Sequence, residues 1–372
     1  MIKKIINNSV PLIFMTVIIF AVPLSNFSAE YIIQELLTRT ARNAFLILSL
    51  LIPITAGLGL NFGMISGAMA GQIGLIFSCD LGFKGLNAII AAALISTPIA
   101  IILGIFSGII LNRAKGHEMI ASYILGFFMN GIYQLIVLYL IGWLIPVHNK
   151  ALLLSRGYGV RNSISLSGIR SALDNFIPAV ITGSEGAKNF SMLNSGNIFL
   201  LIQLPFFDGV IKIPLGTIIL IIISCLIMRW FQNTKLAHDM KAIAQNQTAA
   251  YSAGIPVNRT RITAVVISTV LACYGQIIYL QNIGTLNTYS GHDQAALFSI
   301  AALLIGGASI SRAGIKNLFA GVILFHLIFI TAPNAGKNLI GDAQTGEYFR
   351  VFISYLIIAL SLVIHSRRRH ID

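Results

Sequence analysis

Charged residues are scarce in this chain. Only 10% of its 372 residues are Asp, Glu, Lys or Arg, whereas soluble domains carry about 25%. Hydrophobic residues make up 56% of the chain, and they gather in runs long enough for membrane helices rather than barrel strands. The composition therefore excludes an ordinary soluble domain and predicts an all-α integral membrane protein.

Groups of residues with catalytic or metal-binding chemistry are also missing. Cys79, Cys225 and Cys273 are isolated, which implies neither a disulfide framework nor a metal site. The sequence has no H-E-x-x-H or G-x-S-x-G motif and no Cys/His cluster at ligand spacing. GAKN at 186–189 and GKN at 336–338 lack the flanking residues of a nucleotide-binding P-loop. We therefore expect a chain that is not an enzyme and binds no metal or cofactor itself.

Acidic residues are almost absent from the apolar runs. Asp80 and Glu118 stand at the ends of runs, and His326 is the one histidine in the middle of a run. Transporters driven by protons or sodium usually carry Asp, Glu or His at mid-depth, whereas a lone histidine more often packs with one hydrogen bond. If this chain transports a solute actively, we expect the energy to come from a partner. An ion-coupled secondary transporter remains the alternative.

The chain has a net charge of +13. Its Lys and Arg residues cluster next to the apolar runs, as the topology of a membrane protein requires. No basic stripe with interleaved aromatic residues is present, so the charge does not indicate nucleic acid as a partner. The expected surroundings are those of a lipid bilayer.

The apolar runs predict about ten membrane-spanning helices in a single transmembrane domain, residues 1–372. The N-terminus begins like a signal peptide but lacks a convincing cleavage pattern, so we interpret it as a retained first helix. The second and third runs are nearly continuous, and one of them could be a broken or re-entrant helix. The runs lie near 8–26, 43–60, 61–79, 86–111, 118–144, 212–231, 260–282, 293–310, 315–333 and 347–365.

Basic residues next to the runs predict the orientation. Four basic groups would lie in the cytoplasm: the N-terminus, the turn after the fourth run, the polar segment 231–261 and the C-terminus. Ten alternating spans satisfy all four and place both termini in the cytoplasm. Arg39 and Arg42 fall on the outer side and weigh against this topology. The loop 145–211 would be the large external region.

The longest polar segment between two apolar runs is 231–261. Gly254 in it can end a helix in the left-handed conformation, and Pro256 cannot continue one. We therefore expect the chain to leave the membrane, form a short amphipathic helix and enter the membrane again. The apolar residues of that helix recur at helical spacing: Leu236, Met240, Ile243 and, more weakly, Ala250.

Small residues four apart mark one face of the third run. Gly63, Gly67 and Gly71 form two overlapping G-x-x-x-G units. Glycines at this spacing let two helix backbones approach closely, so helix packing is the simpler interpretation. The alternative is that this face lines a transport path, where small residues leave room.

Amide side chains occur inside the apolar runs, where polar groups are costly. Any one of them could serve only as a hydrogen bond between helices. Together they favour an aqueous or substrate-facing centre for a polar, largely uncharged solute. The candidates are Asn61, Gln72, Asn130, Gln134, Gln276 and Gln281.

Segment 242–280, AIAQNQTAAYSAGIPVNRTRITAVVISTVLACYGQIIYL, resembles the permease subunits of ABC importers for simple sugars, nucleosides and branched-chain amino acids. That family carries the pattern R-A-x-G-x-N-x-x-A-A-x-x-A-G-I-x-V before a membrane helix, and Gln245 replaces its usual Gly. Three further segments match in order and spacing: 59–75, 116–132 and 301–314. The residues that match the pattern are Asn246, Ala249, Ala250, Ala253, Gly254, Ile255 and Val257.

The resemblance implies an ABC importer permease fold with a cytoplasmic coupling loop at 232–259. Within it, the helix at 236–253 would dock on an ATPase, with its apolar side chains in a groove of that partner. The residues expected to make this contact are Leu236, Met240, Ile243, Gln245, Asn246, Ala249, Ala250 and Gly254.

The resemblance also implies the partners and the location. Two cytoplasmic ATPase subunits would bind ATP and Mg, and a second permease chain, identical or related, would complete the path. An external solute-binding protein would dock around 145–211, and the complex would lie in a bacterial cytoplasmic (inner) membrane. Amides without charges at mid-depth favour a simple sugar, a nucleoside or a related compound, with a branched-chain amino acid as the alternative.

Overall fold

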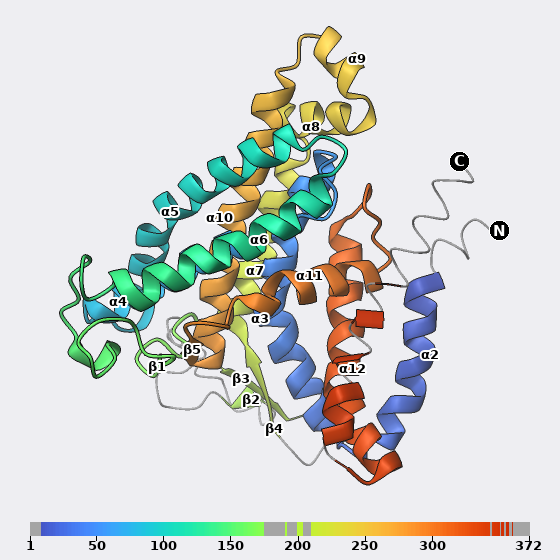
Figure 1. Ribbon diagram of the computed structural model, residues 1–372. Helices are drawn as coiled ribbons and strands as arrows, with labels where there is room; N and C mark the ends of the chain where they lie inside the picture. The colour runs from blue at the N-terminus through green and yellow to red at the C-terminus, as the bar shows by residue number, and fades with distance from the viewer. Residues whose placement is uncertain are drawn as a thin grey trace.

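The computed structural model describes residues 9–174, 190–191, 199–203, 210–342, 344–349, 351–352, 355–356 and 359. Helices dominate these residues (Figure 1). The first helices are α2 (Ser9–Leu24), α3 (Ala29–Thr55), α4 (Met64–Asp80), α5 (Gly85–Arg113) and α6 (Glu118–Leu135), which continues as a π-helical turn (Ile136–Leu140). The later helices are α7 (Leu215–Phe231), α8 (Lys235–Gln245), α9 (Gln247–Ser252), α10 (Val257–Ile283), α11 (Asp293–Ile305) and α12 (Ile315–Ile340). The strands are β1 (Ser163–Ser165), β2 (Phe190–Ser191), β3 (Phe199–Gln203), β4 (Val210–Pro214) and β5 (Thr285–Asn287).

Five of these helices are long and apolar enough to cross a membrane: α3, α5, α6 with its π-helical turn, α10 and α12. The pair of α7 and α8, bent by 69°, adds a sixth if it is taken as one span. The helices α2, α4 and α11 have 16, 17 and 13 residues. The structure thus agrees with a helical, multi-pass membrane protein, while the count of ten spans stays a prediction. The last expected span, 347–365, lies mostly outside the described residues.

Helix α3 begins well before the expected start at residue 43. Ser28 caps it by accepting a hydrogen bond from the backbone N–H of Tyr31 (3.3 Å). Glu35 and Arg39 form an ion pair one turn apart (2.8 Å), and the Arg42 guanidinium lies 5.6 Å from the centre of the Tyr279 ring. The polar first half of α3 is therefore helical, so the expected start of this run at residue 43 is wrong. The side of the membrane on which Arg39 and Arg42 lie stays a prediction.

Helix α10 occupies the centre of the bundle, packed against α3, α4 and α5. A Cβ atom on Gly67 or Gly71 of α4 would lie 2.2 Å from Thr269 O or 2.6 Å from Cys273 O of α10. These two glycines thus stand where the two backbones touch. Gly63 does not belong to this contact, because it precedes α4 and faces the side chain of Asn61.

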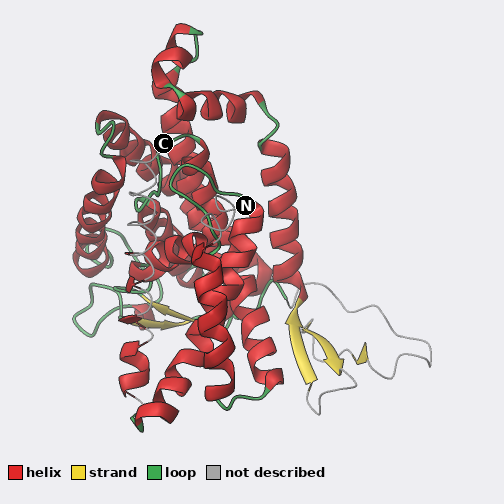
Figure 2. Cartoon of the chain, turned by 90° about the vertical axis from the view of Figure 1, so that its right-hand side faces the viewer, coloured by secondary structure: helices red, strands yellow, loops and turns green. Residues whose placement is uncertain are grey.

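The strands form two sheets in the half of the molecule away from α8 and α9, and Figure 2 shows the two sheets apart from each other (Figures 1 and 2). β1 pairs antiparallel with β5, which joins the segment after α6 to the connection between α10 and α11. β2, β3 and β4 form an antiparallel sheet before α7, and β4 takes the first residues of the run expected to span at 212–231. The loop 145–211 is described as far as residue 174, whereas its apolar piece FIPAVITG (176–183) lies outside the described residues.

Candidate functional site

The polar segment 231–261 folds as two short helices. Thr234 caps α8 by accepting a hydrogen bond from Ala237 N (3.4 Å). The backbone of Asn246 is extended (φ −157°), and its side chain caps α9 by accepting from Ala249 N (3.0 Å). The expected continuous helix at 236–253 is therefore broken at Asn246. Gly254 ends the pair in the left-handed conformation (φ +80°), as the sequence predicts.

The apolar face of α8 points into its own chain. Met240 and Ile243 are 0% and 1% exposed, and Leu236 is half-buried against the main core. Ile243 forms a small cluster with Ala250 and Val257. Met240 and Ile243 do not fit the expectation that they enter a groove of an ATPase, because α3 and α10 already lie against α8. Leu236 is partly exposed, and its expected contact stays a prediction.

The opposite face of α8 and α9 is open. Four of the residues expected to contact an ATPase lie on it: Gln245, Asn246, Ala249 and Gly254. Tyr251, which the sequence did not single out, is 74% exposed beside them. A groove of about 500 Å³ borders this face, and Lys115 and Arg259 give its rim positive charge. A partner can therefore reach these residues without displacing any part of the described chain.

An unwound segment, residues 56–63 between α3 and α4, lies directly beneath α8. Gly57 has φ +71°, and a Cβ on it would lie 2.7 Å from the Cα of Ala244. Only glycine combines this backbone conformation with so close an approach. The backbone N–H of Phe62 donates to Ser122 Oγ (3.2 Å) at the start of α6. The segment thus contacts α8 on one side and α6 on the other.

A buried ion pair fixes the same region. Arg261, the fifth residue of α10, is 0% exposed and donates from Nη2 to Glu118 Oε1 of α6 (2.5 Å). Gly59 meets Met119 of α6 and Ile310 of the turn between α11 and α12. The segments 59–75, 116–132, 242–280 and 301–314, far apart in the sequence, therefore meet here. We call this meeting point, formed by residues 56–63, 118–122, 244–261 and 306–314, the junction.

A second polar group lies inside the bundle. His292 is fully buried, with Nδ1 3.0 Å from Gln72 Oε1 of α4 and Nε2 3.0 Å from Asn130 Oδ1 of α6. Tyr133 Oη donates to Gln72 Oε1 (2.8 Å), and Asn130 Nδ2 donates to Asp293 Oδ1 (3.0 Å). We call these residues, with Gln134, the polar cluster: Gln72, Asn130, Tyr133, Gln134, His292 and Asp293.

The six amides that the sequence predicts for the substrate path do not all meet. Gln134 Nε2 donates to Asn130 Oδ1 (3.3 Å), so Gln72, Asn130 and Gln134 share the polar cluster. Gln276 lies next to it and donates to the carbonyl of Gly291 (3.0 Å). Asn61 instead accepts from Gly63 N (2.9 Å) at the junction. Gln281 is buried near the strand end, where its amide has no hydrogen-bond partner among the described residues.

The sequence did not single out Tyr133, His292 and Asp293. The eighth predicted run begins at residue 293, which leaves His292 in a loop and His326 as the one histidine inside a run. The available signal was the pair Gly306 and Gly307, which ends α11 after 13 residues, too few to span a bilayer. A helix that short begins inside the protein, and the residues just before it are therefore buried. His292 is thus a second buried histidine beside His326, although it lies just before a helix and not within one.

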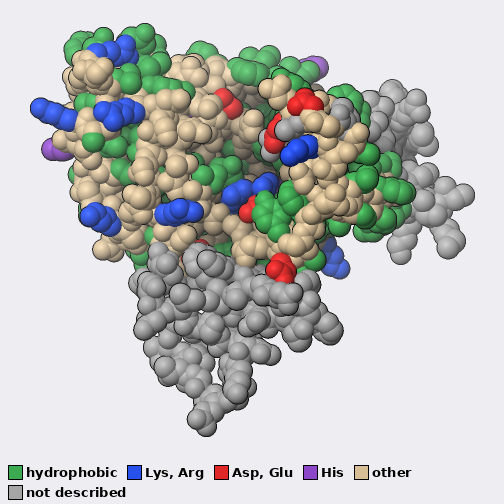
Figure 3. Space-filling model, turned by 90° about the horizontal axis from the view of Figure 1, so that it is seen from below, with side chains coloured by type: hydrophobic (Ala, Val, Ile, Leu, Met, Phe, Trp, Pro, Cys, Tyr) green, Lys and Arg blue, Asp and Glu red, His purple; other side chains and the backbone are tan. Residues whose placement is uncertain are grey.

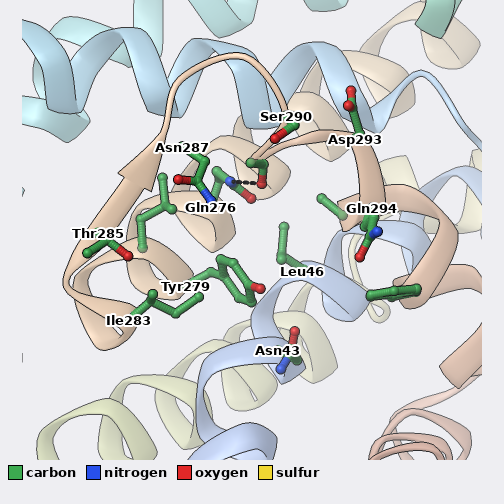
Figure 4. Close-up of a pocket in the computed structure, with 14 residues that line it drawn as sticks. Asn43, Leu46, Gln276, Tyr279, Ile283, Thr285, Asn287, Ser290, Asp293 and Gln294 are labelled. Atoms are coloured by element: carbon green, nitrogen blue, oxygen red, sulfur yellow. Dashed lines mark hydrogen bonds between the residues drawn. The ribbon is translucent and has the colours of Figure 1, made fainter. Parts of the chain in front are cut away.

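A cavity of about 310 Å³ lies between α3, the end of α10, β5 and the start of α11 (Figure 4). Gln276 and Tyr279 of α10 line it from one side, and Ser290 and Gln294 from the other. Among the described residues, no group of three or more His, Cys, Asp or Glu side chains could hold a metal ion. The lining of the cavity contains amide and hydroxyl groups that can form hydrogen bonds with a solute.

Comparison with known proteins gives a family and several relatives. The family described as "branched-chain amino acid transport system / permease component" matches residues 32–361. A probable ABC transporter permease protein of Sinorhizobium fredii is 29% identical over 185 residues, 48% of this chain and 48% of that protein. The ribose import permease protein of Escherichia coli is 26% identical over 142 residues (38% and 42%). The xylose transport system permease protein of Haemophilus influenzae is 26% identical over 180 residues (48% and 45%).

These matches span about half or less of each relative's length. No solved structure matches the chain significantly. The family match, by contrast, covers most of the chain, from within α3 to residue 361.

Proposed function

Because the chain belongs to the family of branched-chain amino acid transport system permease components, we propose that it is the membrane-spanning subunit of an ATP-driven importer. The observation that carries this proposal is the junction. Four segments that resemble an ABC importer permease meet there, directly under α8 and α9. The whole chain, residues 1–372, would form one permease domain in a bacterial cytoplasmic membrane.

The open face of α8 and α9 is our candidate for the ATPase contact. Gln245, Asn246, Ala249 and Gly254 would touch the partner, joined by the exposed ring of Tyr251. ATP and Mg would bind to two such ATPase subunits and not to this chain. The partner can shift the permease between two states only through contacts that differ between them, and the junction supplies contacts to α3, α6 and α10 for that purpose.

Two further partners complete the proposal. A second permease chain, identical or related, would form the other half of the path. An external solute-binding protein would dock at the strand end, around residues 145–211. Relatives named for ribose and xylose transport favour a simple sugar or a related hydroxylated solute, such as a nucleoside. The family description keeps a branched-chain amino acid as the alternative.

A second candidate function is an ion-coupled secondary transporter. The observation in its favour is the polar cluster, in which the buried His292 lies beside Asp293 (3.4 Å). Ionisable groups inside a bundle commonly mark ion or proton pathways. This candidate needs no ATPase, so it makes no use of the exposed face of α8 and α9.

Uptake by the complete importer separates the two functions. Cells expressing the chain with its ATPase and binding protein are supplied with labelled D-ribose, D-xylose, uridine or L-leucine. We expect a hydroxylated solute to be taken up. Its uptake should stop when ATP is depleted and continue when the proton gradient is dissipated. Uptake that follows the proton gradient and survives ATP depletion would establish the secondary transporter instead.

A further inference from the structure

We infer that the cavity between α3, α10 and the start of α11 is a solute-binding site within the single permease chain, selective for a neutral, hydroxylated solute. This inference rests on the proposed importer function and adds the position and chemistry of the site. The cavity of about 310 Å³ lies at the lower end of the range of roughly 300–1,000 Å³ that is typical of small-molecule sites. Such a volume suits a solute of the size of a monosaccharide.

Gln276 is the group that most directly requires a ligand. Its side chain is fully buried and lines the cavity. Its Nε2 atom donates to the carbonyl of Gly291, but its Oε1 atom has no hydrogen-bond partner among the described residues. A buried acceptor without a partner is unfavourable, because it has lost its hydrogen bonds to water and gained none in the protein. A hydroxyl group of a solute in the cavity would supply the missing donor.

The other lining groups suit several hydroxyls at once. Asn43 comes from α3, Asn287 from β5, and Ser290 and Gln294 from either side of the start of α11 (Figure 4). Amides and hydroxyls both donate and accept hydrogen bonds, as sugar hydroxyls do. Tyr279 and Phe298 add aromatic surface for the apolar face of a sugar ring.

Charge argues against an amino acid or a phosphorylated solute. No Lys or Arg side chain is among the described residues that line the cavity, so a carboxylate or phosphate would find no cation there. The start of α11 could attract an anion, but Asp293 occupies that first turn and places a carboxyl group there. Asp293 itself accepts from Asn130 (3.0 Å). A neutral solute needs no cation in the cavity and is not repelled by the carboxyl group of Asp293.

The site also contacts the polar cluster. Gly291 accepts from Gln276 on the cavity side, and a Cβ on Gly291 would lie 2.8 Å from Gln72 Nε2. The next residue, His292, lies within hydrogen-bonding distance of α4 and α6. A solute bound to Gln276 and Ser290 therefore contacts the segment that connects α10 to α11. This same segment reaches the polar cluster through His292.

The test is protection from thiol labelling in the full-length chain, reconstituted with its ATPase in proteoliposomes without the binding protein. Ser290→Cys is placed in a background in which Cys79, Cys225 and Cys273 are replaced by Ala. D-ribose, D-xylose and L-leucine are added at millimolar concentration, and the rate of maleimide labelling is measured. We expect at least one of the sugars to slow labelling by about threefold or more, and L-leucine to leave it unchanged.

Two variants of the same background separate a binding site from a structural effect. Gln276→Leu should abolish the protection, because it removes the buried acceptor. Gln281→Leu is the matched control, since Gln281 is also a buried glutamine of α10 with an unpartnered amide but does not line the cavity. It should leave the protection intact. Ser155→Cys, exposed in the segment after α6, should label at one rate with or without sugar.

The outcomes distinguish this inference from the proposed function. Sugar uptake by the complete importer without protection of Ser290→Cys, or equal loss of protection in both glutamine variants, would overturn the cavity assignment and leave the importer standing. Protection by L-leucine alone would overturn the neutral-solute chemistry. Failure of every solute to enter cells in an ATP-dependent way would refute the importer itself.

Discussion

Arg261 combines full burial with a single ion pair. Glu118 accepts from its Nη2 atom, while Nε and Nη1 have no hydrogen-bond partner among the described residues. A buried charge that loses its partner costs about 3–5 kcal/mol, whereas replacing both partners by apolar groups is often neutral. The pair ties the start of α6 to the start of α10, so its loss acts on the junction directly.

Glu118→Ala should therefore lower the stability of the chain by about 3–5 kcal/mol, measured by thermal unfolding in detergent. The double variant Glu118→Leu with Arg261→Met should recover most of the loss. Glu35→Ala is the control, because the Glu35–Arg39 pair is partly exposed and contributes only about 0–1 kcal/mol. Equal losses in the single and the double variant would contradict the burial argument.

At the scale of elements, the sequence predicted that a helix would form but not which way it would face. Leu236, Met240 and Ile243 show an apolar face by their spacing, and that face is real. The spacing of apolar residues does not show whether this face packs against a partner or against α3 and α10 of the same chain. Both contacts require the same apolar residues. The family pattern did better, because Asn246 and Gly254 act through local backbone geometry, as a cap and a left-handed end.

Position inside the bundle was harder to predict than composition. Gln72, Asn130 and Gln134 were found as costly amides within apolar runs, and they do meet. His292 was missed because its burial depends on where α11 starts in space. Gln281 was grouped with Gln276 although five residues on a helix turn by about 500°, which places the two side chains on different faces. Sequence shows that polar groups need partners but does not identify the partners.

The exposed face of α9 gives the prediction at this scale. Ala249→Asp places a carboxylate on the face proposed to meet the ATPase, and it should abolish co-purification of the ATPase while the chain still inserts into the membrane. Ala151→Asp makes the same change on an exposed alanine in the segment after α6 and should have no effect. Normal co-purification of the ATPase with Ala249→Asp would remove α9 from the interface.

At the scale of the whole molecule, basic residues lie at both ends. Figure 3 shows Lys and Arg side chains spread over the strand end, and Lys150, Arg156 and Arg161 are exposed in the segment after α6. The junction end carries Lys115, Arg259 and others. The distribution of charge therefore does not decide which end faces the cytoplasm. The orientation stays a prediction that rests on the four basic groups of the sequence and on the proposed ATPase contact.

Labelling from one side of the membrane tests this orientation. In the background without native cysteines, Ser155→Cys and Ser252→Cys are both exposed positions at opposite ends. A membrane-impermeant maleimide added to intact spheroplasts should modify Ser155→Cys at once and Ser252→Cys only after permeabilisation. The reverse result would place α8 and α9 on the outer side of the membrane and exclude an ATPase contact there.

The contact between Gly57 and Ala244 has a mechanical consequence. Gly57 contributes only backbone, so no side-chain rotation at that position can absorb a displacement of α8. Atoms in van der Waals contact repel steeply when compressed but attract only weakly when separated. The joint therefore transmits a push from α8 onto residues 56–63 and almost no pull. A pull on α8 is carried instead by its packing against α3 and α10 and by the chain that connects it to α7 and α9.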